Sequence, residues 1–152
     1  MTSRRTRSPL PDELPRRTAL EAATDALARR DHSTNGLVGY LAERGIDVDE
    51  AKQAVDRLAA AGYIDDARVA SVRAESLAAR GYGDAAIRAD LGSRGLAAER
   101  IEAAIGDLDL EASRARSIVE RDGGTARTAR RLIAKGFSED AVEAAIHHSH
   151  PR

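Results

Sequence analysis

The stretch LAERGIDVDEAKQAVDRL (Leu41–Leu58) returns with other letters as LGSRGLAAERIEAAIGDL (Leu91–Leu108) and as LIAKGFSEDAVEAAIHHS (Leu132–Ser149). Each copy has a leucine four residues before a glycine, a basic residue directly before that glycine and an apolar residue directly after it. Alanines and larger apolar residues then recur at matching offsets. This spacing indicates a tandem repeat, which organises the rest of the chain.

The repeated glycines, Gly45, Gly95 and Gly136, are predicted to end one helix and to turn the chain into the next. Glycine readily adopts the left-handed backbone conformation that closes a helix, and the apolar residue after it folds back on the last helical turn. A basic residue stands before each glycine and is expected to lie at the negative end of the helix dipole: Arg44, Arg94 and Lys135. The repeated unit is therefore two helices joined by a tight turn.

Polar residues predict where helices begin. Asp47 and Ser138 follow the glycine turns of the first and third copies and are predicted N-caps, because their side-chain oxygens can accept from free backbone N–H groups. Ala97 stands at the corresponding position of the second copy and cannot cap. Ser33 and Asp65 are predicted to cap helices earlier in the chain.

The remaining helical patterns complete a set of three helices per copy, and no segment alternates with the period of a strand. We therefore predict an all-α fold of three tandem three-helix repeats in an elongated array without a sheet. The predicted boundaries are a disordered N-terminal arm at 1–16, repeats at 17–62, 63–108 and 109–147, and a solvated tail at 148–152.

Composition narrows the classes of protein that this chain can belong to. Hydrophobic residues make up 42% of the chain but aromatic residues only 3%, so the core must be built from alanine, leucine, isoleucine and valine. A net charge of −1 argues against a protein that mainly wraps DNA nonspecifically. The absence of cysteine excludes disulfides and thiolate chemistry. With neither a membrane-spanning run nor a signal-peptide pattern, the expected location is the cytoplasm.

No constellation of residues predicts catalysis. Asp31, His32 and Ser33 are adjacent in a break between helices, where capping is a better interpretation than a catalytic relay. Three further histidines, His147, His148 and His150, are assigned to a solvated terminus because no second cluster completes a metal site. We expect a protein that is not an enzyme and that needs neither a metal nor another cofactor.

Four further segments stand in a characteristic order and spacing: LARRDHS (27–33), GYIDDARVA (62–70), AIRADLGSRGL (86–96) and LIAKGFSEDAV (132–142). Together they resemble the RecX family of bacterial regulators. The resemblance implies a curved, elongated monomer that binds the RecA recombinase or its nucleoprotein filament. It also implies that binding restrains filament extension, strand exchange and the associated ATPase and co-protease activities during DNA repair.

Charge is distributed unevenly along the chain. The segment from Leu110 to Lys135 carries seven basic residues against three acidic ones, so the third copy has a local positive field. This face is either simply solvated or a contact for the acidic surface of a protein filament or for its DNA. The candidate partner-binding residues are Arg114, Arg121, Arg127, Arg130, Arg131, Lys135 and Arg94.

A second class of protein fits the same pattern. Three-helix units with a glycine turn superficially resemble helix-turn-helix modules, so the alternative is a protein that binds DNA by itself. The near-neutral charge and the lack of a long basic helix count against this alternative. Any direct contact with single- or double-stranded DNA is expected to be weak.

Overall fold

The structure is a computed structural model that describes residues 17–150. This part of the chain forms nine α-helices and contains no strand, as predicted. In chain order the helices are α1 (Ala19–Arg29), α2 (Thr34–Glu43), α3 (Val48–Ala60), α4 (Asp66–Ala79), α5 (Asp84–Ser93), α6 (Ala98–Gly106), α7 (Glu111–Asp122), α8 (Ala126–Ala134) and α9 (Glu139–Ser149). The arm predicted at 1–16 lies outside the described residues.

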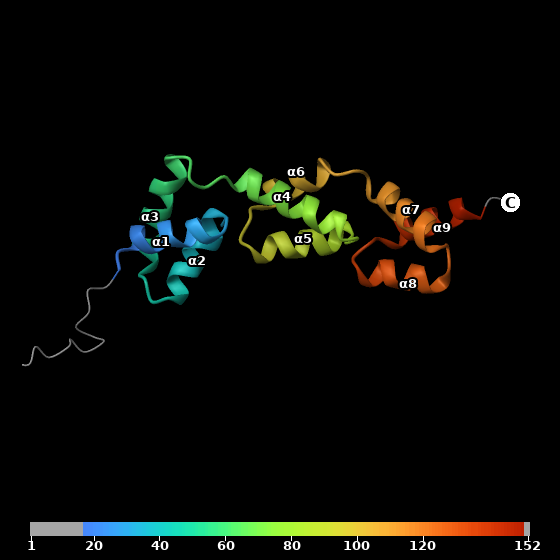
Figure 1. Ribbon diagram of the computed structural model, residues 1–152, viewed down its shortest axis with the longest axis horizontal. Coiled ribbons are helices and arrows are strands. Elements are labelled where there is room, and N and C mark those ends of the chain that lie inside the picture. The colour runs from blue at the N-terminus through green and yellow to red at the C-terminus, as the bar shows by residue number, and fades with distance from the viewer. Residues whose placement is uncertain (1–16, 151–152) are drawn as a thin grey trace, which may run out of the picture.

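The helices group into three units that follow one another along the long axis of the molecule, α1–α3, α4–α6 and α7–α9 (Figure 1). Each unit has its own cluster of buried apolar residues, and no residue belongs to two clusters. Leucines of the repeated pattern are at the centre of all three: Leu41, Leu91 and Leu132 are at most 1% exposed. The array is therefore three small cores in series rather than one large core.

The three repeated glycines end α2, α5 and α8 with the same hydrogen bonds. At the first of them, Gly45 has φ +83° and donates to Ala42, while Ile46 donates to Leu41 over 3.1 Å. Gly95 and Gly136 close their helices in the same way. Gly62 and Gly81 also adopt positive φ and repeat the pattern after α3 and α4, which we did not predict.

The predicted N-caps are confirmed. Ser33, Asp47, Asp65 and Ser138 each accept a hydrogen bond from a backbone N–H in the first turn of α2, α3, α4 and α9. Ala97 makes no such bond at α6, as expected of an alanine.

The predicted tail begins too early. Helix α9 continues through His148 to Ser149, where the hydroxyl of Ser149 donates to the carbonyl of Ile146. This end of α9 lies over the turn before α8, because a Cβ added to Gly124 would meet the side chains of Ser149 and His150. The helix therefore ends beyond the boundary predicted at 147 and lies close to that turn.

Each junction between units joins the glycine turn of one unit to the N-terminus of the middle helix of the preceding unit. Between the first two units, Ser33 Oγ donates to the Arg94 carbonyl over 2.6 Å and the Asn35 amide donates to the Gly95 carbonyl over 3.2 Å. The carboxylate of Asp66 accepts from the backbone N–H and the hydroxyl of Thr34. The following unit thus caps the free N–H end of the helix before it.

The second junction repeats this arrangement with backbone donors. Gly83 N–H donates to the Lys135 carbonyl over 2.9 Å, and Ala85 N–H donates to the Gly136 carbonyl over 3.2 Å. Glu111 accepts from the backbone N–H of Asp84, as Asp66 does for Thr34. The two junctions are therefore equivalent, and they set the spacing of the three units.

Candidate protein-interaction surface

A groove lies where the end of α4 meets α7 and α8. It has a volume of about 450 Å³, and its polar lining is predominantly basic. The cations that line it are Arg80, Arg114, Arg121, Arg131 and Lys135, against the carboxylates of Asp109 and Asp122. We call this the basic groove. The structure thus brings together four of the seven candidate residues and adds Arg80.

Two of the candidates hold the second junction together. The Arg114 side chain is only 11% exposed, donates to the Tyr82 carbonyl over 2.9 Å and forms an ion pair with Asp84. Lys135 Nζ donates to the Arg80 carbonyl over 2.7 Å and lies over the Tyr82 ring. The dipole interpretation of Lys135 therefore needs correction, because this side chain reaches the end of α4 rather than the end of its own helix.

Two other candidates remain available in the basic groove. Arg121 is 71% exposed and Arg131 is 50% exposed, and both contact the carboxylate of Asp122. Arg127 and Arg130 are exposed on α8 but do not line the groove. The exposed candidate residues of the third unit are thus two arginines in the groove and two outside it.

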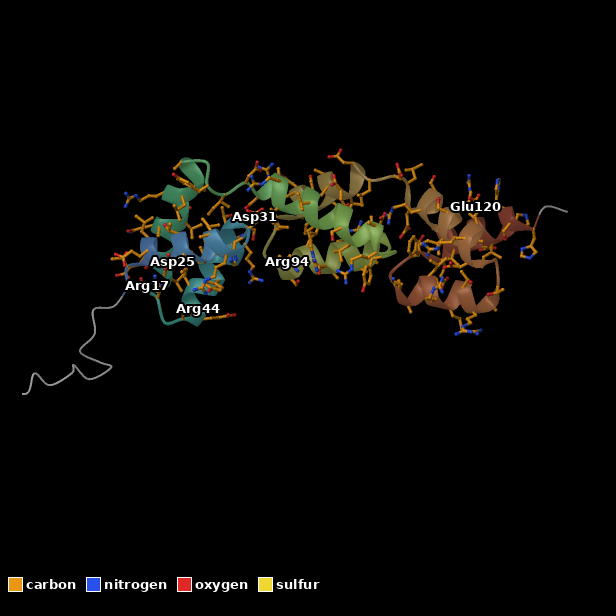
Figure 2. The ribbon with its side chains drawn as sticks, in the orientation of Figure 1. Arg17, Asp25, Asp31, Arg44, Arg94 and Glu120 are labelled. Carbon is orange, nitrogen blue, oxygen red and sulfur yellow. The ribbon has the colours of Figure 1, made fainter. Side chains whose placement is uncertain are left out.

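Arg94 lies elsewhere. It ends α5 at the junction between the first and second units, far from α7 and α8 (Figure 2). Its guanidinium donates to Asp90 over 2.9 Å, and Asp90 also accepts two 3.0 Å hydrogen bonds from Arg73. These hydrogen bonds, those from Arg73 above all, lower the pKa of Asp90 to about 2. Arg94 therefore belongs to an ionic cluster of the second unit.

Sequence reasoning missed Arg80 and Asp122. Arg80 precedes Gly81 and Tyr82 in the same order, basic, glycine, apolar, as the three repeated turns, and this order was the available signal. Asp122 had no such signal, because its partner Arg131 belongs to the next helix and the Gly123–Gly124 turn decides whether they meet.

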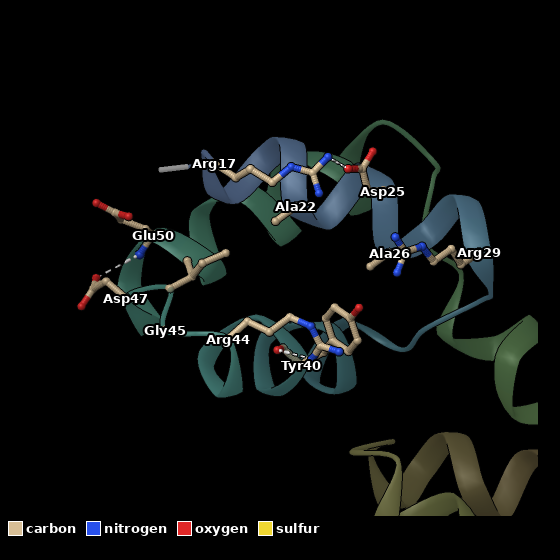
Figure 3. Close-up of a pocket in the computed structure, with 11 residues that line it drawn as sticks. Arg17, Ala22, Asp25, Ala26, Arg29, Tyr40, Arg44, Gly45, Asp47 and Glu50 are labelled. Carbon is tan, nitrogen blue, oxygen red and sulfur yellow. Dashed lines mark hydrogen bonds and ion pairs between the residues drawn. The ribbon is translucent and has the colours of Figure 1, made fainter. Parts of the chain in front are cut away.

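The first unit contains a second and larger groove, which differs in charge. Its volume is about 720 Å³. The Arg44 guanidinium lies 3.4 Å from the centroid of the Tyr40 ring, and Figure 3 shows the two side chains stacked against one another. The charged residues of its lining are balanced: Arg17, Arg29 and Arg44 against Asp25, Asp47 and Glu50. The three positive and three negative side chains cancel in net charge, so this groove is not expected to attract a charged partner.

Asp31, His32 and Ser33, which lie between α1 and α2, each make a different structural contact. Ser33 caps α2, Asp31 forms an ion pair with Arg68 over 3.2 Å, and His32 packs against Tyr40 with ring centroids 5.2 Å apart. Within residues 17–150, no group of three acidic or histidine side chains could hold a metal ion.

Burial of His32 predicts a pH dependence of stability. The residue is 8% exposed, and desolvation, assisted by Arg30, lowers the pKa of its imidazole below 6.5. The unfolded chain then binds the proton more readily than the folded protein does. The contribution of His32 to the free energy of unfolding is therefore complete above pH 6.5 and is lost as the pH falls toward the folded-state pKa.

We expect the urea midpoint to fall between about pH 7.5 and about pH 5.5, and His32→Gln to reduce this fall. The exposed His147 is the control, since His147→Gln should keep the wild-type dependence. An equal slope for His32→Gln and wild type would contradict the assignment.

The fold and this surface define a class of protein: an all-α tandem-repeat protein with a basic groove between its second and third units. None of the helices within residues 17–150 is long and apolar enough to cross a membrane. Residues 19–58 match the family model described as RecX, first three-helix domain, and residues 65–105 match RecX, second three-helix domain. The chain belongs to the RecX family.

Relatives support this membership over most of the chain. A Regulatory protein RecX of Xanthomonas axonopodis pv. citri is 38% identical over 138 residues, covering 84% of this chain and 85% of the relative. The protein of the same name from Xanthomonas oryzae pv. oryzae is 38% identical over 122 residues, covering 80% and 68%. The crystal structure of RecX from Lactobacillus salivarius shares the fold, with a TM-score of 0.72, 17% identity and coverage of 86% and 93%.

Proposed function

We propose that this protein binds the RecA recombinase or its nucleoprotein filament and restrains filament growth, recombinase activity and co-protease activity in DNA repair. The main support for this proposal is that the chain belongs to the RecX family over most of its length. The third unit supplies the contact through the exposed arginines of α8 and the basic groove.

The architecture supports binding along an extended surface. Three units in series present a surface much longer than any one of their cores, and the junction hydrogen bonds keep the units in register. The segment from Leu110 to Lys135, with seven basic residues against three acidic ones, gives the third unit a local positive field in a chain with a net charge of −1. Such a field speeds encounter with an acidic surface and orients docking more than it sets final affinity.

Regulation by binding requires no chemical step. The side chains of Asp31, His32 and Ser33 are committed to an ion pair, an aromatic contact and a helix cap. The purified protein is therefore expected neither to hydrolyse ATP nor to cleave DNA.

Charge reversal on α8 tests the proposal. Arg127→Glu, Arg130→Glu and Arg131→Glu together should slow association with RecA filaments by about tenfold or more at low salt, because electrostatic steering is reversed. Helix content should be unchanged, since all three side chains are exposed. Association rates on immobilised filaments and inhibition of strand exchange are the measurements, and the wild-type effect should diminish as salt rises.

The matched control makes the same change of charge elsewhere. Lys52, Arg57 and Arg100 are exposed on α3 and α6, and their reversal to glutamate should slow association less. Equal inhibition by wild type and the α8 variant at low salt would place the contact surface elsewhere. Tight binding of bare DNA with a steep salt dependence would instead favour a protein that acts directly on DNA.

A further inference from the structure

Two arginines of the basic groove converge on one carboxylate of the same chain. Asp122, the last residue of α7, accepts from Arg121 Nε over 2.9 Å and from Arg121 Nη2 over 3.1 Å. Its second oxygen also accepts from Arg131, which belongs to α8. The Asp122 side chain is only 25% exposed, whereas those of Arg121 and Arg131 are 71% and 50% exposed.

This arrangement has the form of an occupied carboxylate site. A guanidinium offers five N–H donors in a planar fork. Asp122 accepts hydrogen bonds from only some of the N–H groups of Arg121 and Arg131. The remaining donors belong to side chains that are at least half exposed at the groove. Hydrogen bonds from Arg121 lower the pKa of Asp122, so the site holds a charged carboxylate at neutral pH.

We propose that Asp122 is an internal competitor for a two-arginine site that receives a carboxylate from an acidic peptide segment of the partner. Docking of that segment exchanges the internal carboxylate for the partner's. The identity of the partner rests on the proposed function, whereas the chemistry of the site does not. Asp122 would thus weaken partner binding and keep it reversible.

The groove favours an acidic peptide over a nucleic acid. A phosphate backbone needs a continuous basic track, but the cations of this groove are interrupted by Asp109 and Asp122. Arg114 and Lys135 are also already engaged at the junction. What remains is a short site of the kind that planar, bidentate recognition of a side-chain carboxylate requires.

Removal of the internal competitor should strengthen binding. Asp122→Asn keeps the shape of the side chain but removes the charge that holds Arg121 and Arg131, so a labelled oligoglutamate should bind about threefold to fivefold more tightly at low salt. Fluorescence anisotropy of the labelled peptide is the measurement. In a background of Arg121→Gln and Arg131→Gln, Asp122→Asn should produce no such gain.

Asp109→Asn is the matched control. Asp109 lines the same groove, but Arg114 contacts its backbone carbonyl rather than its carboxylate. This variant makes the same change of net charge without releasing an arginine, so its gain in affinity should be smaller. Equal gains from the two variants, or no gain from Asp122→Asn, would overturn the proposal. Tighter binding of oligothymidylate than of oligoglutamate by Asp122→Asn would also overturn it.

The same variants separate this inference from the proposed function. If wild-type protein binds RecA filaments and Asp122→Asn binds oligoglutamate no more tightly than wild type, Asp122 is not an internal competitor and the proposed function stands. If Asp122→Asn binds oligoglutamate more tightly and the wild-type protein does not bind RecA filaments, the two-arginine carboxylate site is supported and RecA is not the partner.

Discussion

Gly83→Ala should destabilise the pairing of the second and third units by about 2–3 kcal/mol, because the added methyl group overlaps backbone rather than a mobile side chain. Its Cβ would lie 2.5 Å from the carbonyl oxygen of Gly136 and closer still to the Phe137 nitrogen. Gly83 has φ −84°, which any residue can adopt, so the cost is steric. The overlap also displaces the N–H that donates to the Lys135 carbonyl. Urea unfolding and amide hydrogen exchange at the junction measure the effect.

Gly92→Ala provides the control at the other end of α5. Nothing lies within 4 Å of a Cβ at Gly92, which is exposed in the last turn of α5. Alanine favours the helix over glycine, so this variant should be more stable by about 0.5–1 kcal/mol. Opposite changes in stability from the same substitution at the two ends of α5 would establish the close approach at Gly83. Equal effects would contradict it.

Leu91→Ala should cost about 3 kcal/mol, and the loss should remain within the second unit. Leu91 is fully buried among residues of that unit alone, including Ile87 and Leu96. Because the first and third units have separate buried clusters, their amide protons should keep their protection when α4–α6 open. Hydrogen exchange resolved by residue is the measurement.

Leu110→Ala is the comparison for this prediction. Leu110 is 77% exposed in the connection before α7, so the same substitution should change stability by no more than about 0.5 kcal/mol. If Leu91→Ala lowers protection equally in all three units, the array unfolds as one cooperative body, and the separation of the cores has no energetic meaning.

The repeat, the helices and most of the helix ends were predictable from local sequence patterns. Leu41, Leu91 and Leu132 stand at one offset from a glycine, and all three are buried at equivalent places. Ser33, Asp47, Asp65 and Ser138 cap the helices that they precede. These features were predictable because hydrophobic periodicity, capping and glycine turns each depend on residues only a few positions apart.

Which basic residues are free depends instead on how the three units pack against one another. The sequence placed Arg114 and Lys135 with the exposed arginines, but stacking of the units commits both to the second junction. Lys135 contacts the carbonyl of a residue 55 positions away, and Ser33 contacts one 61 positions away. Such contacts depend on how whole units are placed against one another. A pattern with the period of a helix turn contains no information about that placement, because each face it predicts is defined relative to one helix alone.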